Sequence, residues 1–207
     1  MKNTYIPAKR KTKIVFVQLG SPTAPTAKAL RKFLKNFLGD PRVVDLNPYL
    51  WKVILNCFVL PFRPRRSAKL YARIWDGQKF PLIANTEKFT DKVREEIKRL
   101  DPGGLVEVDH AFLLSRPYVS DVYDSWEADL KNGTGATKLL VIPLFPQYSE
   151  STIASGIDAL GKEFTRRVKI PTFEVITNFH RSHAFVDNSV RRIDRSIEKL
   201  QQQNINV

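Results

Sequence analysis

The feature that most constrains the fold is a series of short, continuous apolar runs separated by segments with helical spacing. The first run, Ile14 to Leu19, is rich in β-branched residues and ends at Gly20. Such a run is typical of a strand that is buried on both faces of a parallel sheet. Three similar runs follow, at Val106 to Leu114, Lys138 to Phe145 and Thr172 to Thr177.

This alternation predicts an α/β fold: a doubly wound, Rossmann-like (flavodoxin-like) parallel sheet of four strands with helices on both faces and right-handed crossovers. Pro61 is expected to end one helix, and 76–82 to be a loop. The expected helices cover 26–38, 48–60, 65–75, 86–100, 119–130, 151–168 and 182–202. We expect a basic extension at 1–13, one domain at 14–180, and a helix at 181–207 that leads away from it.

Ligands of such sheets bind beyond the carboxyl ends of the strands. The expected ends are 19–21, 112–114, 144–149 and 177–180. In the third, Ser149 or Ser151 could cap the following helix, whose free N–H groups would suit a propionate or phosphate. Capping explains these hydroxyls but accounts poorly for Gln147 and Tyr148. The loop after the first strand, 20–22, has neither a dinucleotide-binding nor a P-loop pattern.

The net charge of +13 indicates an anionic partner, although a solvated basic surface explains it equally well. The candidate partners are a nucleic acid, an acidic membrane surface and an anionic small molecule. One basic cluster lies near the N-terminus and a second follows the apolar segment 50–62, which is shorter than the roughly 20 residues that span a bilayer. The clusters are Lys2, Lys9, Arg10, Lys11 and Lys13, and Arg63, Arg65, Arg66, Lys69 and Arg73.

The single cysteine, Cys57, excludes an intrachain disulfide and a Cys-rich metal or iron–sulfur site. We expect Cys57 to be a small hydrophobe in the core or facing lipid, in a chain that suits a reducing cytoplasm. His180 and His183 could bind a metal at i, i+3 spacing, but no third ligand is evident. Hydrogen bonding at the start of a helix is therefore favoured for this pair. His110, in a strand, is expected in the core.

Four segments, taken in order, resemble the ferrochelatase family and cover nearly all of the chain. The most specific is LFPQYSESTIAS at 144–155, and the others are 17–45, 60–75 and 178–190. The resemblance implies two similar domains with a porphyrin in the cleft between them. This chain supplies the N-terminal domain and, at 181–207, the helix that leads toward the second domain. It also implies insertion of Fe²⁺ into protoporphyrin IX in haem biosynthesis. Iron and porphyrin would be substrates, with no permanently bound cofactor and no iron–sulfur cluster.

The resemblance also implies the porphyrin contacts. Leu19, Phe37 and Leu38 match apolar positions that line the ring. Arg63 matches a residue that holds a propionate, and Tyr148 and Ser149 match the cleft floor. The chain departs from the family at Lys79-Phe80-Pro81-Leu82, usually Gly-Ser-Pro-Leu, and at Leu113-Leu114-Ser115, usually an aromatic or Arg-Tyr pair. Both stretches line the family's cleft, so Phe80, Leu113 and Leu114 are expected contacts that alter porphyrin binding.

In the family, the His that handles the metal lies on the strand after the last helix seen here, and its Glu partner lies further on. Both would follow Val207, and neither His180 nor His183 corresponds to that His. Metallation must remove two pyrrole protons, so the chain alone is expected to bind the ring but to be inactive. A C-terminal half-domain would then be the partner. The alternatives are a non-catalytic porphyrin-binding paralogue and a half-domain that acts as a homodimeric small chelatase.

A membrane surface and a nucleic acid are two further candidate partners. The family resemblance of the apolar segment implies peripheral membrane contact through 50–66, at the cytoplasmic side of the inner membrane. Nucleic-acid binding rests on net charge alone and is not favoured.

Overall fold

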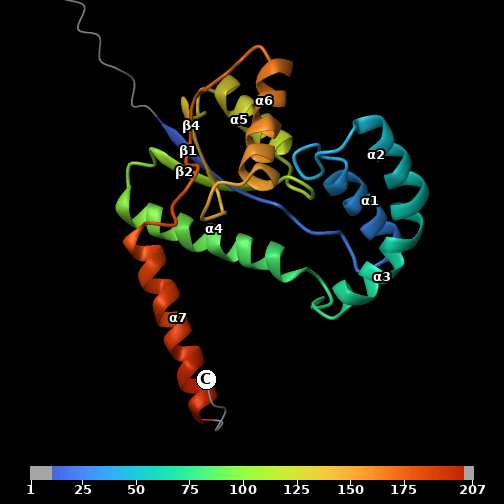
Figure 1. Cartoon of the computed structure of the whole chain (residues 1–207). Helices are drawn as coiled ribbons and strands as arrows, with labels where there is room; N and C mark the ends of the chain where they lie inside the picture. The colour runs from blue at the N-terminus through green and yellow to red at the C-terminus, as the bar shows by residue number, and fades with distance from the viewer. Residues whose placement is uncertain (1–10, 203–207) are drawn as a thin grey trace, which may run out of the picture.

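The computed structural model describes residues 11–202, so positions 1–10 of the expected extension at 1–13 lie outside the described residues, and positions 12 and 13 belong to the first strand. A parallel sheet with the order β2-β1-β3-β4 forms the centre of the molecule (Figure 1). This confirms the predicted four-stranded α/β architecture. The strands are β1 (Thr12–Gln18), β2 (Val106–Phe112), β3 (Lys138–Pro143) and β4 (Thr172–Val175).

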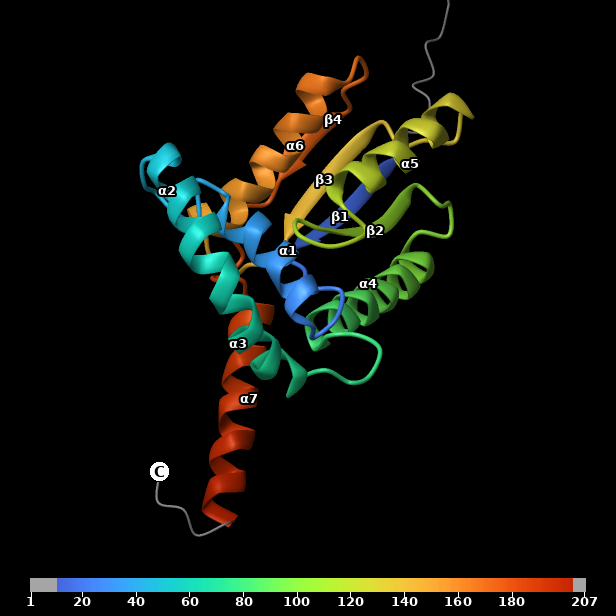
Figure 2. The same ribbon diagram turned by 90° about the vertical axis from the view of Figure 1, so that its right-hand side faces the viewer.

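Apolar side chains cover both faces of β1, which lies between β2 and β3 in the sheet. Val15 and Val17 belong to a buried cluster with Leu160 on the face covered by α5 (Val119–Lys131) and α6 (Ser155–Arg166). On the opposite face, Phe16 packs edge-on against Phe89 of α4 (Pro81–Leu100), with ring centroids 4.9 Å apart. The continuous apolar run at 14–19 is therefore buried between two helical layers, as Figure 2 shows.

A separate helical lobe lies beside the carboxyl ends of the strands (Figure 2). It consists of α1 (Ala27–Leu38), α2 (Pro48–Ile54), the π-helical turn η1 (Leu55–Val59) and α3 (Leu60–Ala72). The Thr26 side chain accepts a hydrogen bond from the Ala29 amide at 3.3 Å, which confirms the predicted cap of α1. The lobe has its own buried cluster, formed by Phe33, Leu34, Leu38, Leu55 and Leu60.

The predicted helix end at Pro61 is wrong, because helical structure continues from Pro48 to Ala72. Pro61 falls in the first turn after η1. A π-turn has already interrupted the i→i−4 pattern there, so the missing N–H of Pro61 removes little. The predicted loop at 76–82 is also too long. Pro81 is the first residue of α4, a position where the fixed φ of proline favours the helix.

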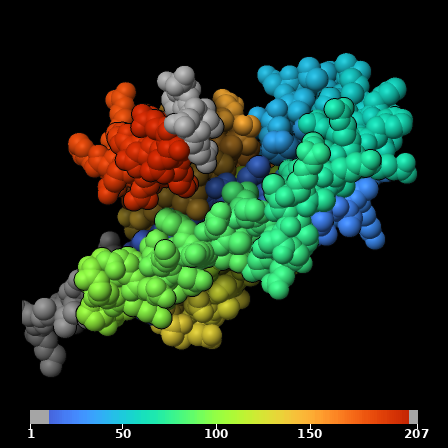
Figure 3. Space-filling view, turned by 90° about the horizontal axis from the view of Figure 1, so that it is seen from below, coloured from blue at the N-terminus to red at the C-terminus, as the bar shows by residue number. Residues whose placement is uncertain are grey.

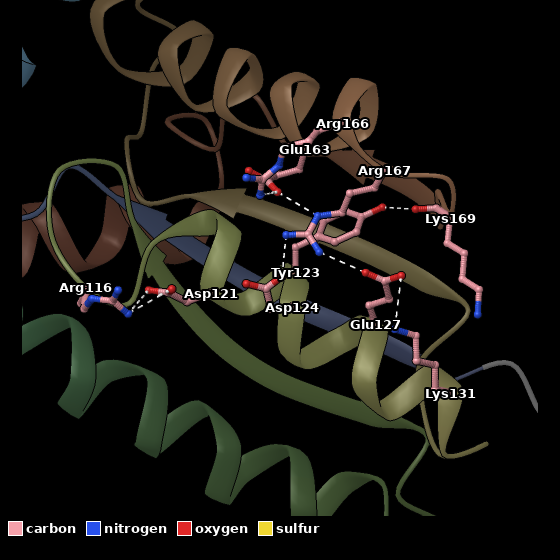
Figure 4. Close-up of polar contacts among 10 residues, drawn as sticks. All are labelled: Arg116, Asp121, Tyr123, Asp124, Glu127, Lys131, Glu163, Arg166, Arg167 and Lys169. Carbon is pink, nitrogen blue, oxygen red and sulfur yellow. Dashed lines mark hydrogen bonds and ion pairs between the residues drawn. The ribbon is translucent and has the colours of Figure 1, made fainter.

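An ion-pair network anchors the segment between α6 and β4 (Figure 4). The Arg167 guanidinium lies 2.5 Å from Asp124, 3.0 Å from Glu127 and 3.0 Å from Glu163. It also lies over the Tyr123 ring, 4.9 Å from the centroid. Burial acts to lower the pKa of Arg167, but hydrogen bonds to these carboxylates raise it above its ordinary value, so the side chain stays charged.

Two expected core residues are more accessible than predicted. Cys57 is exposed on η1, so its interpretation as a core residue is wrong, and its contact with lipid stays a prediction. His110 is only half-buried on β2, although its Nδ1 is buried without a hydrogen-bond partner. Burial lowers the pKa of His110. Within residues 11–202, no helix combines the length and apolar character that a bilayer crossing needs.

Candidate functional site

A cavity of about 550 Å³ opens at the carboxyl edge of the sheet. Its floor includes Leu19, Leu113 and Leu114, the residues that follow β1 and β2. The Leu113 amide donates to the Gln18 carbonyl at 3.0 Å, and the Leu114 amide donates to the Leu19 carbonyl at 2.9 Å. These bonds extend the β1–β2 ladder past the strand ends. The floor is therefore part of the rigid sheet, where ligands of doubly wound folds bind.

The walls of the cavity come from two sides, one from the helical lobe and one from the sheet domain. The last turn of α1 contributes Phe37 and Lys35, and the loop that follows contributes Asp40 and Val43. The opposite wall comes from the π-helical turn η2 (Glu150–Ala154) and from α6. Its residues are Ser151, Ser155, Asp158, Ala159 and Lys162.

The predicted hydroxyl cap of this second wall is wrong. Ser149 occupies the N-cap position, but its side chain makes no capping hydrogen bond. Its Oγ instead lies 3.1 Å from the Ser151 Oγ. The Ser155 hydroxyl donates to the Glu150 carbonyl at 3.3 Å, so it holds the π-turn internally. The hydroxyls in this turn therefore bond mainly with each other and with the backbone.

Four of the predicted ring contacts line this cavity together: Leu19, Phe37, Leu113 and Leu114. Leu38 does not line it and is buried in the adjoining lobe cluster, against which Phe37 and Leu114 also pack. The apolar wall is thus continuous with a packed core. Such a wall is largely formed before a ligand arrives, as is usual for small-molecule sites.

The other predicted contacts lie outside the cavity lining, and their roles stay predictions. Tyr148, 54% exposed, and Ser149 immediately precede η2. Phe80 is buried between Tyr71 and Trp75, with centroid separations of 5.5 Å and 4.6 Å, and lines a different cavity of about 200 Å³. Arg63 is exposed on α3.

Among the described residues, no further metal ligand lies with His180 and His183, the two candidate metal ligands. His183 is exposed at the start of α7 (His183–Gln202). His180 is half-buried, with its Nδ1 unpaired, and its amide donates to the Pro146 carbonyl at 3.0 Å. Residues 11–202 contain no group of three or more His, Cys, Asp or Glu residues that could hold a metal ion. At the start of α7 the Ser182 Oγ accepts from the Phe185 amide at 3.3 Å, so a serine makes the bond expected of the histidines.

Arg42 joins the lobe to the opposite wall of the cavity. Its guanidinium makes a bidentate contact with Asp158, at 2.5 Å and 3.0 Å, and lies 3.4 Å from Glu150. The hydrogen bond from Arg42 lowers the pKa of Asp158, which keeps this carboxylate ionised. Bidentate pairs fix geometry as well as charge. The pair therefore bridges α6 and the loop that follows α1.

Sequence reasoning missed the charged residues of the site. Lys35, Arg42, Asp158 and Lys162 read as ordinary solvated charges along the chain. The sequence contained one indication of two of them. Asp158 and Lys162 follow Ser155 at helical spacing in the helix after the third strand, so they share a helix face with it. The resulting site combines an apolar floor with charged walls. It suits an apolar ligand that carries charged groups at its edge.

Comparison with known proteins identifies relatives over almost the whole chain. The sequence model of the Ferrochelatase family matches residues 11–207. A ferrochelatase of Idiomarina loihiensis is 40% identical over 182 residues, which are 88% of this chain and 48% of that protein. A ferrochelatase of Marinobacter nauticus is 39% identical over 87% of this chain and 47% of its own length.

A third relative carries a more specific name. The coproporphyrin III ferrochelatase of Streptococcus mutans is 38% identical over 86% of this chain and 54% of its own length. The chain thus spans about half the length of the curated relatives it matches.

Proposed function

The chain belongs to the ferrochelatase family, and we propose that it forms the porphyrin-binding N-terminal half of an enzyme that inserts Fe²⁺ into protoporphyrin IX in haem biosynthesis. One observation carries this proposal. Leu19, Phe37, Leu113 and Leu114, far apart in sequence, line one cavity at the carboxyl edge of the sheet. Its volume of about 550 Å³ lies within the roughly 300–1,000 Å³ typical of small-molecule sites.

The proposed task of this half is to bind and orient the ring. The leucine floor removes one face of the macrocycle from water, and burial of apolar surface supplies the affinity. The charged walls remain available to the acidic side chains at the ring edge. Iron and the ring are substrates in this proposal, and the rest of the enzyme supplies the group that accepts the pyrrole protons.

Replacing Leu113 with Asp tests the proposed site. Titrating protoporphyrin IX into the 207-residue chain should give a saturable shift of the Soret band. Leu113→Asp should raise Kd at least about tenfold, because a carboxylate in the floor must lose water and repels the ring propionates. Leu100→Asp, at an exposed leucine ending α4, is the matched control and should leave Kd unchanged. A wild-type chain that gives no saturable shift, or equal Kd values for the two variants, would contradict the proposal.

We further infer that α7 and β4 form the contact with the C-terminal half-domain. Every residue of α7, coloured orange to red in Figure 3, is at least partly exposed. Val186, Val190 and Ile193 are exposed and form an apolar stripe at helical spacing. Phe173 of β4 is also 49% exposed. An apolar stripe on a projecting helix favours a protein partner over water.

Mixing the chain with the purified C-terminal half of the Idiomarina loihiensis relative should give a 1:1 complex in sedimentation velocity. Ile193→Asp should abolish that complex, and Val168→Asp, at a fully exposed loop position, should preserve it. Dimers of the chain alone that Ile193→Asp dissociates would favour the homodimeric small chelatase instead.

The segment 50–66 has both features that a peripheral membrane contact needs, which are exposed apolar side chains and nearby cations. Its exposed apolar side chains include Leu50, Val53, Phe58 and Phe62. Arg65 and Arg66 follow on the same continuous helical segment, 48–72. Apolar groups beside cations suit an acidic membrane surface. This contact and the cytoplasmic location stay predictions.

A further inference from the structure

The charged groups around the cavity fall into two classes. Arg42 is already paired with Asp158 and Glu150. Lys35 and Lys162 also line the cavity. Within the described residues neither is in direct contact with a carboxylate, although Lys162 acts at longer range to lower the pKa of Asp158. Arg42 is therefore engaged, and the two lysines are the cations of the lining that can meet a ligand.

The two lysines approach the cavity from different walls. Lys35 lies in the last turn of α1, and Lys162 lies in α6, one turn beyond Asp158. Asp40, the other acidic group of the lining, accepts a hydrogen bond from the Arg42 amide at 2.9 Å through its Oδ1. Because Asp158 is neutralised by Arg42, the remaining charge of the lining is two cations against one anion.

We propose that Lys35 and Lys162 each bind a carboxylate at the edge of the porphyrin, so that the site ranks porphyrins by the number of their carboxylates. This inference rests on the proposed function. A ring lying on the leucine floor points its substituents toward the walls. A tetracarboxylate such as coproporphyrin III has an acidic group on every pyrrole, so both lysines meet one. The two propionates of protoporphyrin IX share one edge and reach the two walls less completely.

The inference assigns the acidic groups to residues that the family resemblance did not mark. Arg63, the resemblance-based candidate, is exposed on α3 and does not line the cavity. Lysine suits the task because its ammonium is a flexible point charge that can follow a carboxylate at the ring edge.

The test compares three porphyrins on the full chain by Soret titration: coproporphyrin III, protoporphyrin IX and protoporphyrin dimethyl ester. The wild-type chain should bind them in that order of decreasing affinity. Lys35→Ala and Lys162→Ala should each raise Kd for coproporphyrin about fivefold, as expected for a partly exposed ion pair. The double variant should lose the ranking, whereas affinity for the ester should stay constant throughout.

Two further variants sharpen the test. Lys28→Ala removes the same charge from the same helix, about 10 Å along its axis from Lys35, and should leave all three affinities unchanged. Asp40→Asn keeps the acceptor for the Arg42 amide but removes the anion, and should tighten coproporphyrin binding.

The outcomes separate this inference from the proposed function. If no porphyrin binds, the proposed function fails. If all three bind while Lys35→Ala and Lys162→Ala match Lys28→Ala, the lysine assignment is overturned and porphyrin binding stands. Equal losses for the ester and for coproporphyrin would also overturn it, because an ester carries no charge for an ammonium group to attract.

Discussion

Replacing Arg167 with alanine is expected to lower the free energy of unfolding by about 3 kcal/mol, because it leaves several carboxylates without their counterion. The Arg167 side chain is 13% exposed and lies against Asp124, Glu127 and Glu163. Glu163, with a side chain 10% exposed, loses its buried partner. The stacking on Tyr123 is lost as well. Urea unfolding followed by circular dichroism measures the change.

Arg166→Ala is the matched control for this prediction. Arg166 is the neighbouring residue and contacts Glu163 at 2.6 Å, but its side chain is 61% exposed. Its removal should cost less than about 1 kcal/mol, as exposed ion pairs usually do. Similar losses for the two variants would mean that the Arg167 network does not anchor α5 to α6.

Replacing Gly20 with alanine is expected to cost about 2–4 kcal/mol of unfolding free energy, from backbone strain and a steric clash together. Gly20 has φ +93°, and an added Cβ would lie 2.4 Å from the Ser115 Oγ. Ser115 is buried, and its Oγ accepts from the Ser21 amide at 3.3 Å, so it has little room to move. Because Leu19 is adjacent, porphyrin affinity should fall as well. Urea unfolding and the Soret titration report the two losses.

Gly77→Ala separates the two causes. Gly77 has φ +100°, but no atom lies within 4 Å of an added Cβ, so only strain of about 1–2 kcal/mol applies. Ser115→Ala, combined with Gly20→Ala, removes the clashing oxygen and should recover part of the lost stability. Equal costs for Gly20→Ala and Gly77→Ala would show that the contact with Ser115 is not tight.

The strands were largely predictable, because burial on both faces leaves a direct mark on the sequence. The apolar run at 14–19 corresponds to β1, which begins two residues earlier, at Thr12. Lys13 hid that start, since its buried ammonium is paired with Glu107 and Asp129 at 3.5 Å and 3.6 Å. Local sequence could not reveal these partners, which lie on other elements. The helix through Pro61 was missed for a similar reason, because a π-turn leaves no clear pattern.

The apolar half of the candidate site was predictable, and its charged half was not. Leu19, Leu113 and Leu114 follow strands, so topology alone brings them to one edge. The Arg42–Asp158 pair spans 116 residues and depends on how the lobe packs beside α6. Periodicity identifies the polar face of a helix, but it does not tell which of its charges faces a cavity. That choice is made by tertiary packing.

The continuous helical segment 48–72, formed by α2, η1 and α3, has a mechanical consequence. Leu55 and Leu60 of this segment share one packed cluster with Phe33 and Leu38 of α1. The helical segment 48–72 and α1 should therefore move as a single rigid body. Among residues 11–202, Arg42 makes the ion pairs that connect this body to α6. The width of the cavity is then set by the Arg42 ion pairs at its rim and by the packing of Leu114 against the lobe cluster at its floor. A force on the outer surface of the helical segment 48–72 would therefore be transmitted through α1 to the cavity wall that faces the ring.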